Sequence, residues 1–297
     1  LSLTVWFVIA GLLLLWLFMR WQRRLERRGR EPLIGPSLLQ ERQLTGGLIT
    51  FLFLFLIQAG VFFTVPLFLS VVLGLSPMET GLRLLPLSLA LLVAATGVPR
   101  FLPHAPPRRI VRVGLLALIG GVLVLIGSLE VGADSSIVLV PLLIVGLGIG
   151  SLASQLGNVT VSAVPAEKSS EVGGLQNTAT QLGASFGTAL AGSVLIAALT
   201  ASFLGGIEQN PDVPQSLKDK AETRLAAGAP FISQADAATA LEEAGVPEDQ
   251  TSVILAQNEA SQIEGLRAAL SILALMGVIA LFFTGRIPLR QPGSEPT

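Results

Sequence analysis

The chain has 297 residues, of which 51% are hydrophobic and only 13% are charged, and its mean hydropathy is +0.71. Soluble domains carry about 25% charged residues, so this composition excludes an ordinary water-facing surface. The net charge of −1 gives no general affinity for nucleic acid, and the absence of cysteine excludes disulfides and thiolate metal sites. One histidine and no tyrosine leave few acid–base groups, so we expect no catalytic residues, no metal site and no enzyme activity.

Seven apolar segments follow one another along the chain, at residues 2–19, 46–73, 82–100, 111–130, 136–158, 173–203 and 266–285. A hydrocarbon layer of about 30 Å is crossed by about 20 helical residues, a length that these segments provide. Seven in series are not typical of a soluble core, so we predict an all-α integral membrane protein. The chain opens inside an apolar run with no charged leader, which favours a piece of a longer protein over a signal peptide.

The basic residues predict how these segments are oriented. If the first span ends in the cytoplasm at RWQRRLERRGR, alternation places residues 20–45, 100–112, 159–172 and 286–297 inside. These four segments hold seven, four, one and two basic residues, which is 14 of the 19 in the chain. Cytoplasmic loops are enriched in Lys and Arg, so this registration is favoured. The basic run itself suits either anionic headgroups or the simpler role of fixing orientation.

The domain organisation follows from these ranges. We predict an extra transmembrane helix at 1–19, a basic cytoplasmic linker at 20–45 and five transmembrane helices at 46–203. A last transmembrane helix follows at 266–285, with a cytoplasmic tail at 286–297. Between them, residues 204–265 are polar and acidic and are predicted to form a small helical loop outside the cytoplasm, with helix starts that include Ser233 at an N-cap.

The stretch GGLQNTATQLGASFGTALAG at residues 173–192 places amides inside an apolar helix. Asn177 and Gln181 fall on one stripe of a helix with 100° per residue, and Gly183 and Gly187 fall on a neighbouring stripe. Glycines spaced by four let two membrane helices pack closely. The amides are therefore expected either to hydrogen-bond a neighbouring helix or to line a cavity, since unpaired amides are costly in hydrocarbon.

Two further segments carry candidate residues. Gly146 and Gly150 repeat the glycine pattern in the preceding span and are expected to serve helix packing. The span at 46–73 is rich in phenylalanine, including Phe62, and contains one amide, Gln58. Such a wall suits either lipid contact or an adaptable pocket for aromatic compounds.

These residues carry a family resemblance that covers essentially the whole chain. The run at 146–192, LGLSPMETGLRLLP at 73–86, EPLIGPSLL after the arginines and the long outer loop resemble the major facilitator superfamily. More narrowly, the chain resembles the C-terminal half of the fourteen-span drug:proton antiporters of the EmrB/QacA type. The resemblance implies a six-helix bundle preceded by one extra helix. It also places Arg108 and Arg109 in a degenerate cytoplasmic loop motif, at the cytoplasmic rim.

The resemblance implies proton-coupled multidrug efflux by alternating access, with Gln58, Phe62, Asn177 and Gln181 as candidate cavity residues. It implies the inner membrane of a bacterium, no cofactor beyond a proton gradient, and as partners an amphipathic or aromatic small molecule, the lipid bilayer and a missing N-terminal half. No nucleic acid partner is expected. Two alternatives stay open: a carrier for one metabolite, and a non-transporting membrane scaffold that recruits a partner through 204–265.

Overall fold

The computed structural model describes residues 3–30, 32–33, 35–130, 134–209, 233–243 and 248–289, and over these ranges it is helical with no strand. The long helices are α1 Leu3–Arg27, α2 Arg42–Leu67, α3 Pro77–Phe101, α4 Pro107–Ser128, α5 Leu139–Val161, α6 Ser169–Gln209 and α9 Glu248–Phe283. The short elements are η1 Leu38–Gln40, η2 Phe68–Val72, η3 Ser135–Val138, η4 Ala166–Lys168, α8 Gln234–Glu243 and η5 Thr284–Arg286. In these ranges, seven helical segments are long and apolar enough to cross a membrane, which confirms the predicted all-α membrane fold.

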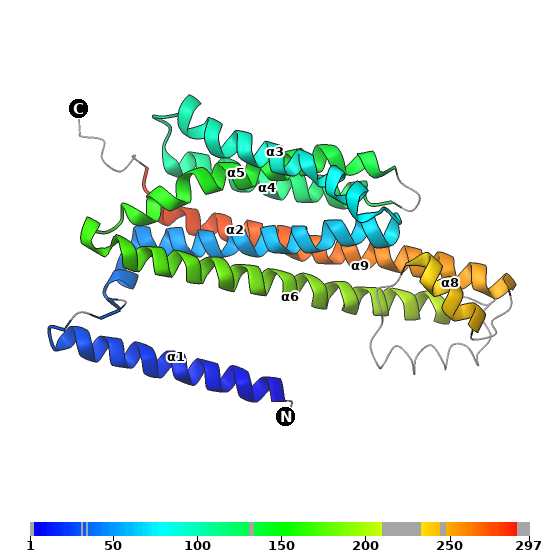
Figure 1. The fold of residues 1–297 in the computed structure, drawn as a ribbon, viewed down its shortest axis with the longest axis horizontal. Coiled ribbons are helices and arrows are strands. Elements are labelled where there is room, and N and C mark those ends of the chain that lie inside the picture. The colour runs from blue at the N-terminus through cyan, green and yellow to red at the C-terminus, as the bar shows by residue number, and fades with distance from the viewer. Residues whose placement is uncertain are drawn as a thin grey trace.

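Successive long helices alternate in direction, so the turns between them gather at two opposite ends of the bundle (Figure 1). One end, here called the basic end, collects the linker before α2, the α3–α4 turn, the α5–α6 turn and η5. Gln43 Nε2 donates to Val159 O at 2.8 Å across this end, and Gly35 N donates to Glu171 Oε2 at 2.9 Å. The segments that the basic residues predict to lie on one side of the membrane therefore meet at one end of the bundle.

Several helices extend beyond their apolar segments because local capping and packing set their limits. Helix α3 begins at Pro77, where Ser76 and Glu79 form a reciprocal capping box. Helices α6 and α9 both continue into the range predicted as an outer loop, and Gln257 Nε2 donates across them to Ser202 O at 3.1 Å.

The described part of the acidic segment is also helical. The Ser233 N-cap is present before α8, since Asp236 N donates to Ser233 Oγ at 3.2 Å. Residues 210–232 and 244–247 of the predicted helical loop lie outside the described residues.

The core of the bundle is made of aliphatic side chains from most of its helices. Leu118 of α4, Leu142 of α5 and Leu273 of α9 are fully buried within one cluster. In a bilayer this burial gains little, because lipid tails are as apolar as leucine. Close packing and interhelical hydrogen bonds must therefore hold the helices together.

Helix α1 lies apart from the bundle (Figure 1). Nearly all of its apolar side chains are exposed. Only 6% of its membrane-length window is buried within the protein. An apolar helix with this exposure suits contact with lipid on most sides.

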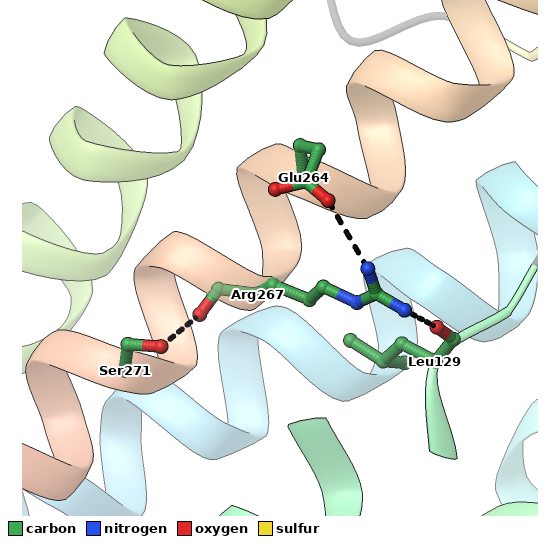
Figure 2. A network of polar contacts seen from close by, with 4 residues as sticks. All are labelled: Leu129, Glu264, Arg267 and Ser271. Carbon is green, nitrogen blue, oxygen red and sulfur yellow. Dashed lines mark hydrogen bonds and ion pairs between the residues drawn. The ribbon is translucent and has the colours of Figure 1, made fainter. Parts of the chain in front are cut away.

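Arginines join α4 and α9 near both ends of the bundle. At the basic end, Arg108 of α4 donates to Gly285 O at 2.6 Å and to Ile287 O at 2.7 Å, just beyond α9. At the opposite end, Arg267 of α9 donates to Leu129 O at 2.7 Å, just beyond α4 (Figure 2). Each arginine supplies donors to carbonyls that the other helix leaves unpaired at its C-terminus.

The surroundings of Arg267 separate a strong contact from a weak one. Figure 2 shows its guanidinium between Glu264 Oε1, at 3.1 Å, and the Leu129 carbonyl. A hydrogen bond from a charged donor contributes about 1.5–3 kcal/mol, whereas an exposed ion pair contributes about 0–1 kcal/mol. The bond to Leu129 is therefore the stronger of the two contacts, and it is the one that joins α9 to the end of α4.

Candidate functional site

The site begins with the glycines that bring α6 onto α2. A β-carbon at Gly183 would collide with Leu52 O, and one at Gly187 would collide with Leu56 O. Only glycine allows the two backbones to approach this closely. The packing fixes the rotation of α6 about its axis, and with it the direction of every other side chain on the helix.

The same arrangement recurs between α5 and α3. A β-carbon at Gly146 would collide with Leu87 O, and one at Gly150 would collide with Leu91 O. A third contact joins α5 to α4, where Gly148 and Gly114 face each other's carbonyl oxygens. The apolar run of Gly114 also holds Gly120, Gly121 and Gly127, and none of these glycines shows the spacing of four that marked the other positions.

Helix α2 has four faces, three of which are covered. Leu52 and Leu56 lie against α6, Gly60 lies against Leu273 of α9, and Gly47 lies against Thr160 of α5. The fourth face carries Phe51, Phe55, Gln58 and Phe62, which recur every three or four residues. Phe51 and Phe55 stack with ring centroids 6.0 Å apart, Gln58 is half-buried, and Phe62 is 40% exposed.

The amides of α6 separate into two groups. Gln176 Nε2 donates to Thr160 Oγ1 and, at 3.4 Å, to Gly157 O, so it joins α6 to α5. Asn177 and Gln181 are exposed, and no hydrogen bond joins either of them to another described residue. Thr178 returns its hydroxyl to Gly174 O of its own helix. Gln176 thus has a structural contact, while Asn177 and Gln181 are open to a ligand or another part of the protein.

We call the fourth face of α2 together with the exposed amides of α6 the open face. It comprises Phe51, Phe55, Gln58, Phe62, Asn177 and Gln181. The open face offers flat apolar rings and neutral hydrogen-bonding groups, and none of these side chains carries a charge.

The two rim candidates differ in their surroundings. Arg108 is half-buried and bound to the carbonyls beyond α9, as described above. Arg109 is exposed. The acceptors of Arg108 are backbone atoms, so the α3–α4 turn is attached to the segment beyond α9 through carbonyl oxygens.

Apart from the open face, a hollow lies at the basic end, between α3, α4 and α5. It has a volume of about 490 Å³, with Pro99, Pro103 and Pro107 on one wall and Ser154, Gln155 and Asn158 among the residues on the other. Gln155 is buried and Asn158 is exposed, and both lie near the basic end of α5. Their position on the side of α5 away from α2 separates this hollow from the open face.

A bundle of membrane-length helices that alternate in direction and pack through glycines defines an integral membrane protein. The sequence profile of the Major Facilitator Superfamily matches residues 2–188. The chain therefore belongs to the Major Facilitator Superfamily.

Curated relatives carry names that refer to resistance and export. The chain is 30% identical over 185 residues to the multidrug resistance protein Stp of Mycobacterium tuberculosis, covering 62% of this chain and 34% of the relative. It is 34% identical over 176 residues to the tetracenomycin C resistance and export protein of Streptomyces glaucescens, covering 57% and 31%. It is 28% identical over 232 residues to a probable actinorhodin transporter of Streptomyces coelicolor, covering 77% and 39%. These matches span about a third to two-fifths of the length of the relatives.

Proposed function

We propose that this chain is the C-terminal half of a fourteen-span secondary transporter that exports amphipathic or aromatic compounds by alternating access. The open face is the observation that carries the proposal. In transporters built from two bundles, substrate sites lie near the midplane where the bundles face each other. Here α2 and α6 would contribute one wall of that cavity, and the N-terminal half would contribute the other.

Helical geometry supports a common direction for the two parts of the open face. Helices α2 and α6 run the same way, and α6, α9 and α5 follow one another around α2 in the sense of increasing helical angle. The stripe of Phe51, Phe55, Gln58 and Phe62 falls in the remaining quadrant, opposite α9. Around α6, Asn177 and Gln181 lie on the flank that faces this same quadrant, while Leu182 and Phe186 lie on the flank toward the lipid.

The chemistry of the open face favours uncharged, partly aromatic cargo. Aromatic rings offer flat apolar contact, and the amides offer both donors and acceptors without a fixed charge. The names of the relatives, which refer to multidrug resistance and to the export of tetracenomycin C, agree with such cargo.

The energy source in this proposal is the proton gradient. Among the described residues, the acids of α2 to α6 lie near helix ends, at Glu79, Glu171 and Glu208, rather than at mid-membrane depth. An ionisable residue within the membrane is the usual sign of a proton relay. We therefore place the coupling carboxylate in the N-terminal half.

Orientation in the membrane follows from the same reasoning. The basic end would face the bacterial cytoplasm, and the acidic segment between α6 and α9 would lie outside the inner membrane. The alternation of the helices supports this assignment.

Dye efflux from a pump-deficient bacterial strain that expresses the full-length gene tests this function. We expect efflux of several unrelated aromatic dyes, and we expect an uncoupler to abolish it. Efflux that persists without a proton gradient would contradict the coupling. Resistance to a single compound would instead favour the metabolite carrier, and no transport with any cargo would favour the scaffold.

A further inference from the structure

The end of α1 and the linker form a basic elbow whose shape is fixed by several backbone contacts. Gly29, at φ +67°, ends α1 in a Schellman motif, in which Arg30 N donates to Leu25 O at 3.1 Å and Gly29 N donates to Glu26 O at 3.1 Å. Leu33 N then donates to Gln22 Oε1 at 3.0 Å, and Gln22 is fully buried. The bond from Gly35 N to Glu171 attaches the elbow to α6.

Two hollows lie at this elbow and share three residues. One has a volume of about 480 Å³ and is lined by Trp16, Met19, Arg20, Arg23, Arg24 and Arg27. The other has a volume of about 530 Å³ and is lined by Met19, Arg23, Glu26, Arg27, Pro36, Ser37, Leu39 and Gln40. Met19, Arg23 and Arg27 line both, and these volumes lie in the range of small-ligand sites, about 300–1,000 Å³.

The arginines of the elbow lack anionic partners within the described ranges. The ion pair between Arg267 and Glu264 is the one that those ranges contain, and it lies far along the chain from the elbow. Arg20 lies over the ring of Trp16, 5.2 Å from its centroid. Of the arginines at the elbow, Arg23 and Arg27 are the two that line both hollows. Glu26 lines the second hollow as a single carboxylate, so the balance of charge there remains positive.

The position of the elbow relative to the membrane indicates which kind of anion could reach its arginines. Arg23 and Arg27 occupy the last turns of a membrane-length apolar helix, at the level where a span leaves the hydrocarbon. Trp16 and Trp21 are both exposed nearby, as tryptophans at a membrane interface commonly are. A ligand here would meet arginine donors at one end and the apolar surface of α1 at the other.

We propose that the elbow is a binding site for an anionic phospholipid of the leaflet at the basic end, with Arg23 and Arg27 holding the phosphate. Guanidinium groups match phosphate oxygens with paired donors. Met19 and the exposed apolar side chains of α1 lie against the acyl chains. The site does not depend on what the transporter carries.

Binding of phosphatidylglycerol to the purified full-length protein tests the site, with native mass spectrometry as the readout and phosphatidylcholine as the neutral comparison. We expect R23Q/R27Q to weaken retention of phosphatidylglycerol about tenfold or more, because it removes the guanidinium donors that line both hollows. The matched control is R28Q/R30Q, which removes the same charge from the same segment but changes no residue that lines either hollow. It should retain the lipid within about threefold of the unaltered protein.

Three results would overturn the proposal. Equal losses in the two double variants would indicate diffuse attraction rather than a site. Equal retention of phosphatidylcholine would remove the role of the anion. Displacement of phosphatidylglycerol by millimolar inorganic phosphate would identify a site for free phosphate instead. R23K/R27K, which keeps the charge, should bind more weakly than the unaltered protein if the paired donors matter, and thermal melting confirms that each variant is folded.

Discussion

Gly187→Leu is expected to destroy the packing of α6 on α2 and to reduce transport to background. The new side chain would begin at a position already occupied by Leu56 O, which is backbone and cannot rotate away. Gly187→Ala should be milder, at a cost of about 1–3 kcal/mol, the usual range for overpacking in a close-packed interior. Thermal unfolding of the purified protein measures both changes.

Helix propensity alone would make both variants of Gly187 more stable, so the experiment separates propensity from packing. Leucine and alanine both favour a helix over glycine by up to about 1 kcal/mol, so a loss of stability must come from the contact. Gly174→Leu on the same helix is the matched control, because nothing lies within 4 Å of a β-carbon there. If the two leucine variants melt alike, the close approach of α6 and α2 is wrong.

Gln181→Leu is expected to spare the fold and to lower efflux of hydrogen-bonding cargo by about 5- to 150-fold, because an unmet hydrogen bond to a cargo costs about 1–3 kcal/mol. Gln58→Leu should act in the same way from α2, the other helix of the open face. Neither amide has a hydrogen-bond partner within the part of the chain that the structure describes, so neither change removes an internal contact. Initial rates of efflux at matched expression levels measure the effect.

Gln176→Leu provides the contrast on the same helix. Its amide binds Thr160 Oγ1 and Gly157 O, so its loss should lower the melting temperature before it changes the choice of cargo. Unchanged efflux of every cargo in Gln181→Leu would contradict a role in cargo binding. Unchanged stability in Gln176→Leu would contradict a role in helix packing.

The number and direction of the helices could be predicted, because the length of each apolar segment and the positions of the arginines can be read directly from the sequence. Seven segments and their alternation follow from hydropathy alone, and each has a helix in the structure. The ends were less predictable. Capping by Ser76 starts α3 before its apolar run, and Gln257 of α9 packs against Gly206 of α6 where both helices continue past theirs. Hydropathy carries no information about either interaction.

The details of the open face could be predicted only in part. The sequence placed Asn177 and Gln181 on one stripe but left open whether they bind a helix or line a cavity, because that depends on how α6 is rotated against its neighbours. The glycine contacts with Leu52 and Leu56 determine that rotation. The contacts of Arg108 could not be predicted either. Its acceptors are backbone carbonyls beyond α9, and every residue has a backbone carbonyl, so the sequence does not indicate which ones are bound.

The most direct test of the open face is the reaction of single cysteines with a charged, membrane-impermeant thiol reagent in the full-length protein. These 297 residues contain no cysteine, so new ones at Gln181 and Leu182 add no background from this part of the chain. The two positions are adjacent but point about 100° apart on the helix. We predict that Gln181→Cys reacts and is protected by a transported dye, whereas Leu182→Cys stays unreactive in lipid. Reaction at Leu182→Cys with none at Gln181→Cys would contradict the account.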